Sequence, residues 1–237
     1  MQVPHLSGIF GRLPGMATPH DRDVLVLGPE NPRGIVLFGS GSGGDPARYR
    51  TVLTAPADAG YRVLAPHHPR FVPDTATSDE FVERPRGLKD ALARHGGSGD
   101  LPVFAVGHSI GGWAALCLAG AVPRDPDGHP LPVPTEPRVS RLVLFAPPLG
   151  WFHGPGALDA LSVPVTVFVG ERDPITPPAT IEILHRSRGQ VDAQVLPRVG
   201  HFDFMDALPP GVEPDPALDR AAFLRDLGES TVAALAP

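Results

Sequence analysis

Cysteine is almost missing from this sequence, since Cys117 is the only one among 237 residues. A single thiol excludes an internal disulfide, and we expect Cys117 to pack in the core. Long apolar stretches are also missing, because no run reaches the roughly 18 residues of a membrane span. The opening residues, MQVPHLSGIFGRLPG, lack the basic segment and apolar core of a secretory signal. We therefore predict a soluble, cytoplasmic protein without an integral membrane segment.

Clustered positive charge is missing as well. The 20 Lys and Arg residues are scattered and the formal net charge is -6, which argues against a nucleic-acid partner. What is present is a high apolar content of 42%, distributed along the chain. A chain of this size suits one domain, residues 1–237, with a substantial core. The 31 prolines and 27 glycines fall between apolar segments, where they mark loops.

Short apolar segments alternate with segments of helical character. This alternation predicts an α/β fold with a doubly wound, mostly parallel sheet. A hairpin between 6–10 and 23–27 would supply an antiparallel edge. Pro85 should kink its helix or delay its start, and the short region between the strands at 141–146 and 163–169 leaves room for little or no cap. The predicted strands are 23–27, 34–38, 61–65, 103–106, 141–146, 163–169 and 191–196, and the predicted helices are 47–59, 78–94, the segment after Ser109, 178–187 and 217–235.

The segment 102–117, PVFAVGHSIGGWAALC, is the centre of the predicted fold. It begins as a buried strand and ends in good helix formers. Between them, Gly107, Ser109 and Gly111 form a G-x-S-x-G motif on a sharp strand-to-helix turn. Glycine on either side removes the Cβ atoms that would clash there. This context predicts Ser109 as a nucleophile, with the Ile110 amide facing an oxyanion; the alternative is a simple glycine-rich turn.

A serine nucleophile needs a base, and ten histidines are available. In a parallel sheet, reactive groups gather at the carboxyl ends of strands, so the base should lie in a loop that follows a strand. His201 does so, in the sequence VGHFD after the last predicted strand. His108 adjoins the serine and should point elsewhere, whereas His67 and His68 follow an earlier strand and could line the pocket. We predict His201 as the general base.

The acid that orients this histidine should also follow a strand. The strand 163–169 leads into GERDPI, and Asp173 is the predicted acid, whose carboxylate would accept the second imidazole N–H of His201. Glu171 and Asp206 are alternatives, and Asp173 could instead only cap the helix that follows.

The loop 39–44, GSGSGG, allows two interpretations. It satisfies G-x-G-x-x-G, the dinucleotide fingerprint, between a predicted strand and a helix. A nucleotide site would need an acidic residue at the end of the next strand to bind the ribose, and that strand instead ends in Ala65-Pro66-His67. We therefore favour an oxyanion-binding loop, with nucleotide binding as the alternative.

With these residues assembled, the chain resembles the α/β-hydrolase superfamily over nearly its whole length. It looks most like the small, minimally capped branch of dienelactone hydrolase-like and platelet-activating-factor acetylhydrolase-like serine esterases, through GHSIGG, GERDPITPP and GHFDF. Many relatives carry H-G-x-G in the first loop, which aligns with residues 40–43 and implies Ser42 as the second oxyanion donor. Ser40 replaces the usual histidine, and Ser109 stands where dienelactone hydrolases carry cysteine, so dienelactone is not the expected substrate.

These features predict a serine hydrolase that cleaves small-molecule carboxylic esters through an acyl-enzyme, without a metal or other cofactor. Ser109 would attack, His201 would move the proton and Asp173 would hold His201. Thioester or amide hydrolysis, acyl transfer, and a non-catalytic ligand-binding relative are alternatives. The short cap favours an open site and compact substrates. The candidate pocket residues are Ser40, Gly41, His67, Phe71, His108, Trp151, Phe152, His153 and Phe202.

Overall fold

A seven-stranded sheet runs through the computed structural model, which describes residues 23–72, 75–97 and 99–236. Its strand order is β1-β3-β2-β4-β5-β6-β7. β1 runs antiparallel to β3 and the other neighbours are parallel, so the predicted fold class is confirmed. The segment 6–10, the expected hairpin partner, lies outside the described residues. The strands are β1 (Val24–Leu27), β2 (Ile35–Gly39), β3 (Arg62–Pro66), β4 (Val103–His108), β5 (Val139–Phe145), β6 (Val165–Gly170) and β7 (Val191–Leu196).

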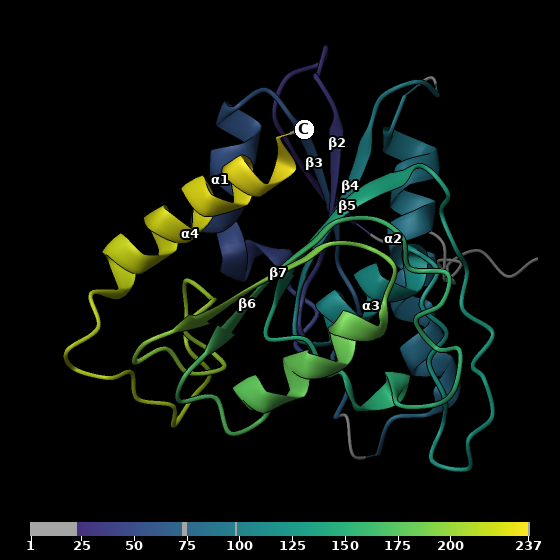
Figure 1. The fold of residues 1–237 in the computed structure, drawn as a ribbon. Coiled ribbons are helices and arrows are strands. Elements are labelled where there is room, and N and C mark those ends of the chain that lie inside the picture. The colour runs from purple at the N-terminus through teal and green to yellow at the C-terminus, as the bar shows by residue number, and fades with distance from the viewer. Residues whose placement is uncertain (1–22, 73–74, 98, 237) are drawn as a thin grey trace, which may run out of the picture.

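Helices cover both faces of the sheet (Figure 1). α1 (Arg50–Asp58) packs beside α4 (Arg220–Leu235) on one face, and α2 (Ser78–His95) packs beside α3 (Ile110–Leu118) on the other. β2 and β4 are buried along their whole length, as expected for central parallel strands that are covered twice. Their side chains alternate between two cores: Leu37 faces α2 and α3, whereas Phe38 faces α1 and α4.

Two of the predicted helices differ in type from the expectation. The segment 47–59 begins as a 3₁₀ turn, η1 (Pro46–Tyr49), before α1, and the segment 178–187 is a 3₁₀ helix throughout, η4 (Pro178–Arg186). In η4, Thr180 N–H donates to Pro177 O at 2.9 Å, the tighter spacing of a 3₁₀ helix. Two prolines at its start supply no N–H donors, which weakens an α-helical alternative.

The helix around Pro85 is not delayed by that proline. α2 already begins at Ser78, because Thr77 and Glu80 form a capping box that fixes the start. The closing helix begins at Arg220, where Asp219 caps it through the Ala222 N–H. Capping side chains therefore set both starts.

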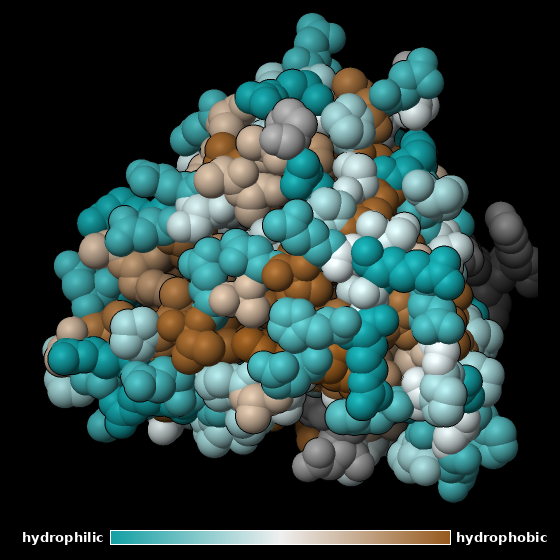
Figure 2. Space-filling view, viewed as in Figure 1, coloured by the Kyte–Doolittle hydropathy of each residue, from teal (hydrophilic) through white to brown (hydrophobic). Residues whose placement is uncertain are grey.

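The segment between β5 and β6 is short, so no cap domain from this segment covers the carboxyl edge of the sheet. The segment there holds only turns and the short 3₁₀ helix η3 (Gly150–Phe152), in agreement with the expectation of little or no cap. No helix in the described part of the chain combines the length and apolar character needed to cross a membrane. In the view of Figure 2, hydrophilic residues cover most of the surface and apolar ones show between them.

Three glycines allow α3 to lie directly on the sheet. Gly39 of β2 and Gly107 of β4 are neighbours in register, and Gly111 of α3 packs over both. A Cβ on Gly39 would lie 2.7 Å from Gly111 Cα, and a Cβ on Gly111 would overlap the carbonyl of Gly39. Since backbone atoms line this contact, no side chain can move aside to make room.

Replacing Gly111 by alanine should therefore destabilise the fold. We expect Gly111→Ala to lower the free energy of unfolding by about 3 kcal/mol, measured by urea denaturation, because overpacking forces backbone shifts. Gly150→Ala is the matched control, since its added Cβ would meet nothing within 4 Å. Equal stability of the two variants would contradict this account of the strand-helix contact.

Candidate active site

Ser109 occupies a strained turn between β4 and α3. Its backbone has φ 52° and ψ -126°, in the positive-φ region that residues with a Cβ seldom adopt. The close packing of Gly107 against Gly111 forces the chain to reverse within this one residue. Its N–H donates to Phe145 O at 2.8 Å, which ties the turn to β5. The sequence motif thus has the strand-turn-helix setting that its interpretation requires.

The structure brings the three predicted catalytic side chains together. His201 Nε2 lies 3.0 Å from Ser109 Oγ, and His201 Nδ1 lies 2.7 Å from Asp173 Oδ2. Asp173 follows β6 and His201 follows β7, so both lie at the carboxyl ends of their strands. The His201 and Asp173 side chains are 4% and 0% exposed, which keeps water from competing for the hydrogen bond between them.

Asp173 is held by more than the histidine. Its Oδ1 accepts the N–H groups of Ile175 and Thr176 at 2.8 and 2.9 Å, and its Oδ2 accepts the Thr176 hydroxyl at 2.6 Å. Burial raises the pKa of Asp173, but the hydrogen bond and charge of His201 and the bonds from Thr176 outweigh it and leave the pKa below its ordinary value. The carboxylate is therefore ionised at neutral pH. The sequence analysis did not predict a role for Thr176, because this residue belongs to no recognised motif.

The two alternative acids have other partners. Glu171 accepts the Arg198 N–H at 3.1 Å, and Asp206 accepts the Thr51 N–H at 3.1 Å. Within the described residues, neither has a hydrogen bond to His201. Geometry therefore selects Asp173, which serves both as a local turn cap and as the partner of the imidazole.

The glycine-rich loop after β2 passes close to Ser109. A Cβ on Gly41 would lie 3.7 Å from Ser109 Cβ. Arg84 of α2, only 2% exposed, donates to Gly41 O at 3.1 Å and to Ser42 O at 3.2 Å, so the loop carbonyls face this guanidinium. In the part of the chain that the structure describes, the amides of Ser42 and Ile110 donate no hydrogen bond. These two N–H groups are the predicted oxyanion donors.

A crevice of about 400 Å³ opens beside Ser109. Of the candidate pocket residues, Gly41, His108 and Phe202 border it, together with Arg70 and Met205. It is open to solvent, as the small cap predicts.

The other candidate pocket residues lie elsewhere, so these assignments need correction. Phe152 is buried in the core, and Phe71 packs against Phe81 and under the guanidinium of Arg84. An apolar side chain in a loop that follows a strand can point into the core or into the crevice, and sequence spacing does not distinguish the two directions. The rest are placed as follows: Ser40 is buried, Trp151 lines a separate hollow with Thr176, His67 lies 3.8 Å from Asp45, and His153 is exposed.

His108 also differs from a substrate-contacting residue. It is 1% exposed, and both ring nitrogens have protein partners: Nδ1 lies 2.8 Å from Tyr49 Oη and Nε2 lies 2.8 Å from His201 O. Burial, with the nearby His201 adding to it, lowers the pKa of His108 to about 3. The ring is therefore neutral at neutral pH.

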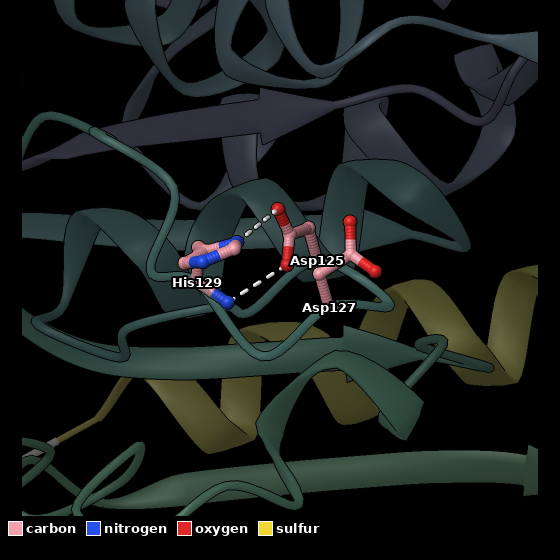
Figure 3. Close-up of side chains that lie close together, drawn as sticks. All are labelled: Asp125, Asp127 and His129. Atoms are coloured by element: carbon pink, nitrogen blue, oxygen red, sulfur yellow. Dashed lines mark hydrogen bonds and ion pairs between the residues drawn. The ribbon is translucent and has the colours of Figure 1, made fainter.

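Asp125, Asp127 and His129 form a cluster of possible metal ligands on an exposed turn (Figure 3). Their ligand atoms lie within 4.8 Å of one another. His129 Nδ1 lies 3.4 Å from Asp125 Oδ2, and the His129 N–H donates to Asp125 Oδ1 at 2.7 Å. These contacts close the turn by themselves, and we assign the cluster no ligand.

Comparison with known proteins adds information on the fold. Neither the protein-family models nor the curated proteins match this chain. Among solved structures, an α/β serine hydrolase homologue from Coxiella burnetii is 14% identical with a TM-score of 0.60, over 90% of this chain and 91% of that one. The apo form of Thermogutta terrifontis esterase 2 is 16% identical with a TM-score of 0.61, over 90% of this chain and 91% of its own. Paleococcus ferrophilus monoacylglycerol lipase is 16% identical with a TM-score of 0.62, over 90% of this chain and 99% of its own.

Identities this low carry the fold and nothing finer. The chain has the α/β-hydrolase fold, as its motifs predicted. The narrower resemblance to the dienelactone hydrolase-like and platelet-activating-factor acetylhydrolase-like branch stays a prediction.

The buried neutral His108 should make the protein sensitive to acid. Between pH 6.5 and about 3, the unfolded chain binds a proton at this imidazole that the folded chain does not, so stability should fall as pH falls. The slope should be about 1.4 kcal/mol per pH unit at most. Urea denaturation across this range should give a flatter profile for His108→Gln than for the wild type. His153→Gln, on the surface, should follow the wild type; if all three profiles coincide, His108 does not titrate as described.

Proposed function

We propose that this chain is a serine hydrolase that cleaves carboxylic esters, with Ser109, His201 and Asp173 as its catalytic residues. The observation that carries the proposal is the unbroken line of contacts from Ser109 Oγ to His201 Nε2 at 3.0 Å and from His201 Nδ1 to Asp173 Oδ2 at 2.7 Å. A hydroxyl, an imidazole and a buried carboxylate in this order can activate a nucleophile and stabilise the charge that develops on the imidazole.

The reaction follows from these positions. Ser109 Oγ attacks the ester carbonyl carbon while His201 Nε2 takes the hydroxyl proton, which gives a tetrahedral oxyanion. His201 then returns the proton to the leaving alcohol, and the acyl group remains on Ser109. Water repeats the sequence, with its proton passing through His201, and releases the carboxylic acid. Asp173 stays ionised throughout and holds the Nδ1–H tautomer.

The oxyanion would be bound by two backbone amides. The Ile110 N–H lies at the start of α3, where the helix dipole is positive, and the Ser42 N–H lies in the loop that crosses beside Ser109. Arg84 supports this arrangement because its bonds to the loop carbonyls leave the amides to face the other way.

An ester with a small acyl group fits the setting best. The crevice is open and about 400 Å³ in volume, and a short segment follows β5 in place of a cap. Solved forms of the similar Thermogutta terrifontis esterase 2 hold propionate or butyrate, which supports short acyl chains as the first substrates to test. Thioesters and amides are the competing classes, and a substrate panel separates them. The predicted cytoplasmic location belongs to the same proposal.

Removing the nucleophile is the direct test. We expect Ser109→Ala to lower kcat on p-nitrophenyl acetate or butyrate by roughly four to six orders of magnitude with the melting temperature unchanged. A fluorophosphonate should label the wild type and not this variant; esterase 2 of Thermogutta terrifontis is phosphonylated by cyclosarin, a reagent of related chemistry. Ser162→Ala, at an exposed position, is the control that should behave as wild type. Labelling or hydrolysis that persists in Ser109→Ala would remove the proposed mechanism.

A second test addresses the support of the acid. Thr176→Val removes the 2.6 Å hydrogen bond to Asp173 Oδ2 while keeping the shape of the side chain. We expect kcat/KM to fall about tenfold, since a bond to a charged group contributes roughly 1.5–3 kcal/mol. Thr180→Val, which loses only a bond to Pro177 O at the surface, should keep full activity. A Thr176→Val enzyme as active as the wild type would show that the backbone N–H groups alone hold Asp173.

A further inference from the structure

A chain of hydrogen bonds runs beneath the proposed site and joins three of its loops. The Gly41 N–H donates to Tyr49 Oη at 3.1 Å. Tyr49 Oη lies 2.8 Å from His108 Nδ1, and His108 Nε2 lies 2.8 Å from the backbone carbonyl of His201. The loop after β2, the turn that carries Ser109 and the loop after β7 are therefore linked through two side chains.

The direction of every bond in this chain is determined by its ends. The His201 carbonyl can only accept, so His108 Nε2 must carry the proton. A neutral ring then has Nδ1 as an acceptor, and the Tyr49 hydroxyl must donate to it. The hydroxyl oxygen remains free to accept the Gly41 N–H. Every donor in this series of hydrogen bonds thus has an acceptor, and the series forms with His108 in a single tautomer.

Both linking side chains are enclosed by the protein. Tyr49 and His108 are 2% and 1% exposed. Phe38 packs on the Tyr49 ring at 4.8 Å between centroids, and Phe204 packs on His108 at 5.6 Å. Burial holds the pKa of Tyr49 far above its ordinary range, so the hydroxyl keeps its proton. Both side chains border the crevice beside Ser109 only with their edges, and their polar atoms are engaged in the hydrogen bonds described above.

The position of His201 depends on this series of hydrogen bonds. It lies beyond β7, the edge strand, whose middle residues are exposed. Its loop is closed locally by the Gly200 N–H, which donates to Asp203 Oδ2 at 2.8 Å, and by the ion pair of Asp203 with Arg220 at 3.0 Å. Other bonds join the loop to neighbouring elements, since the Arg172 N–H donates to Val199 O at 3.0 Å and the Asp206 N–H donates to Arg48 O at 2.7 Å. Neither of these involves the turn that carries Ser109. The bond from His108 does, because His108 directly precedes Ser109 in the sequence.

We propose that His108 and Tyr49 are positioning residues that set the distance between the His201 imidazole and the Ser109 hydroxyl, by fastening the backbone carbonyl of His201 and the N–H of Gly41 to the turn that carries the nucleophile. The proposal rests on the function proposed above. It assigns the histidine of GHSIGG a role in alignment, with the oxyanion loop and the base held by the same pair of side chains.

Two amide substitutions at His108 distinguish its bond to the His201 carbonyl from its bond to the Tyr49 hydroxyl. Gln places its amide nitrogen near the position of Nε2 and can still donate to the His201 carbonyl. Asn ends near Nδ1, so it can still accept from Tyr49 but cannot reach His201. Tyr49→Phe removes the hydroxyl and keeps the ring. Leu53→Ala is the matched control, since it lies in the same core next to η1 without a polar contact and loses stability only.

Turnover is measured per active site, counted by titration with a fluorophosphonate, so that a smaller folded fraction does not count as slower chemistry. We expect His108→Asn to lower kcat about 30- to 100-fold and Tyr49→Phe about 5- to 20-fold, since misplacement by about 1 Å costs up to 10²-fold. His108→Gln should stay within about fivefold of the wild type. KM should change less than about threefold in all three, and Leu53→Ala should keep the wild-type kcat.

Equal turnover per titrated site in the wild type, His108→Asn and Tyr49→Phe would overturn the proposal and leave these residues a structural role only. Equal losses in His108→Asn and His108→Gln, with Tyr49→Phe unaffected, would overturn it as well, because the ring would then merely fill space. If the His108 variants do not fold, Tyr49→Phe decides alone. Failure of the proposed function has a different signature: the wild type itself would show no labelling or turnover that depends on Ser109.

Discussion

The whole site depends on the contact in which Gly111 of α3 rests on Gly39 and Gly107 of the two central strands. Backbone touches backbone there, so the chain has a single residue in which to reverse from strand to helix. That residue is Ser109, and its φ of 52° is the conformational cost of the reversal. The same contact aims the first amides of α3 at the carboxyl edge of the sheet. The proposed nucleophile and the proposed oxyanion donor thus arise from one packing constraint.

Parallel strands then bring the other groups to that edge. Asp173 and His201 come from loops after β6 and β7, which pair with each other, and the order β4-β5-β6-β7 lets the two loops reach back toward Ser109. Because each loop starts from a fixed strand end, distances of 3.0 and 2.7 Å are reached between residues that are far apart in the sequence. The sheet supplies alignment, and short local bonds such as those of Thr176 refine it.

The sequence was sufficient to predict the fold and to find the three motif residues whose side chains meet at one edge of the sheet. Ser109 was found from the glycine spacing, and Asp173 and His201 from their positions in loops that follow predicted strands. Residues that act from other elements could not be found this way. Arg84 and Tyr49 come from α2 and η1, and their contacts with the loop exist only after these elements pack on the sheet. Phe71 and Phe152 show the opposite error, since the sequence placed them in the pocket and they lie in the core. The direction of a single turn decides whether an aromatic residue after a strand lines the pocket or packs in the core.

The imidazoles of His108 and His201 lie 4.9 Å apart at the centre of the site, and they need opposite charge states. In the proposed reaction the His201 imidazole becomes positively charged while the ester is attacked, and a second positive charge beside it would oppose this change. Two unit charges at this distance would repel by roughly 3 kcal/mol at an effective dielectric constant of about 20. Burial keeps His108 neutral, so its ring can donate to the His201 carbonyl without opposing the charge on the His201 ring. An arginine or lysine could supply the same donor, but it would bring a permanent charge. A buried neutral histidine provides one donor and one acceptor without a charge. At position 108, next to Ser109, the donor reaches the His201 carbonyl and the acceptor reaches the Tyr49 hydroxyl.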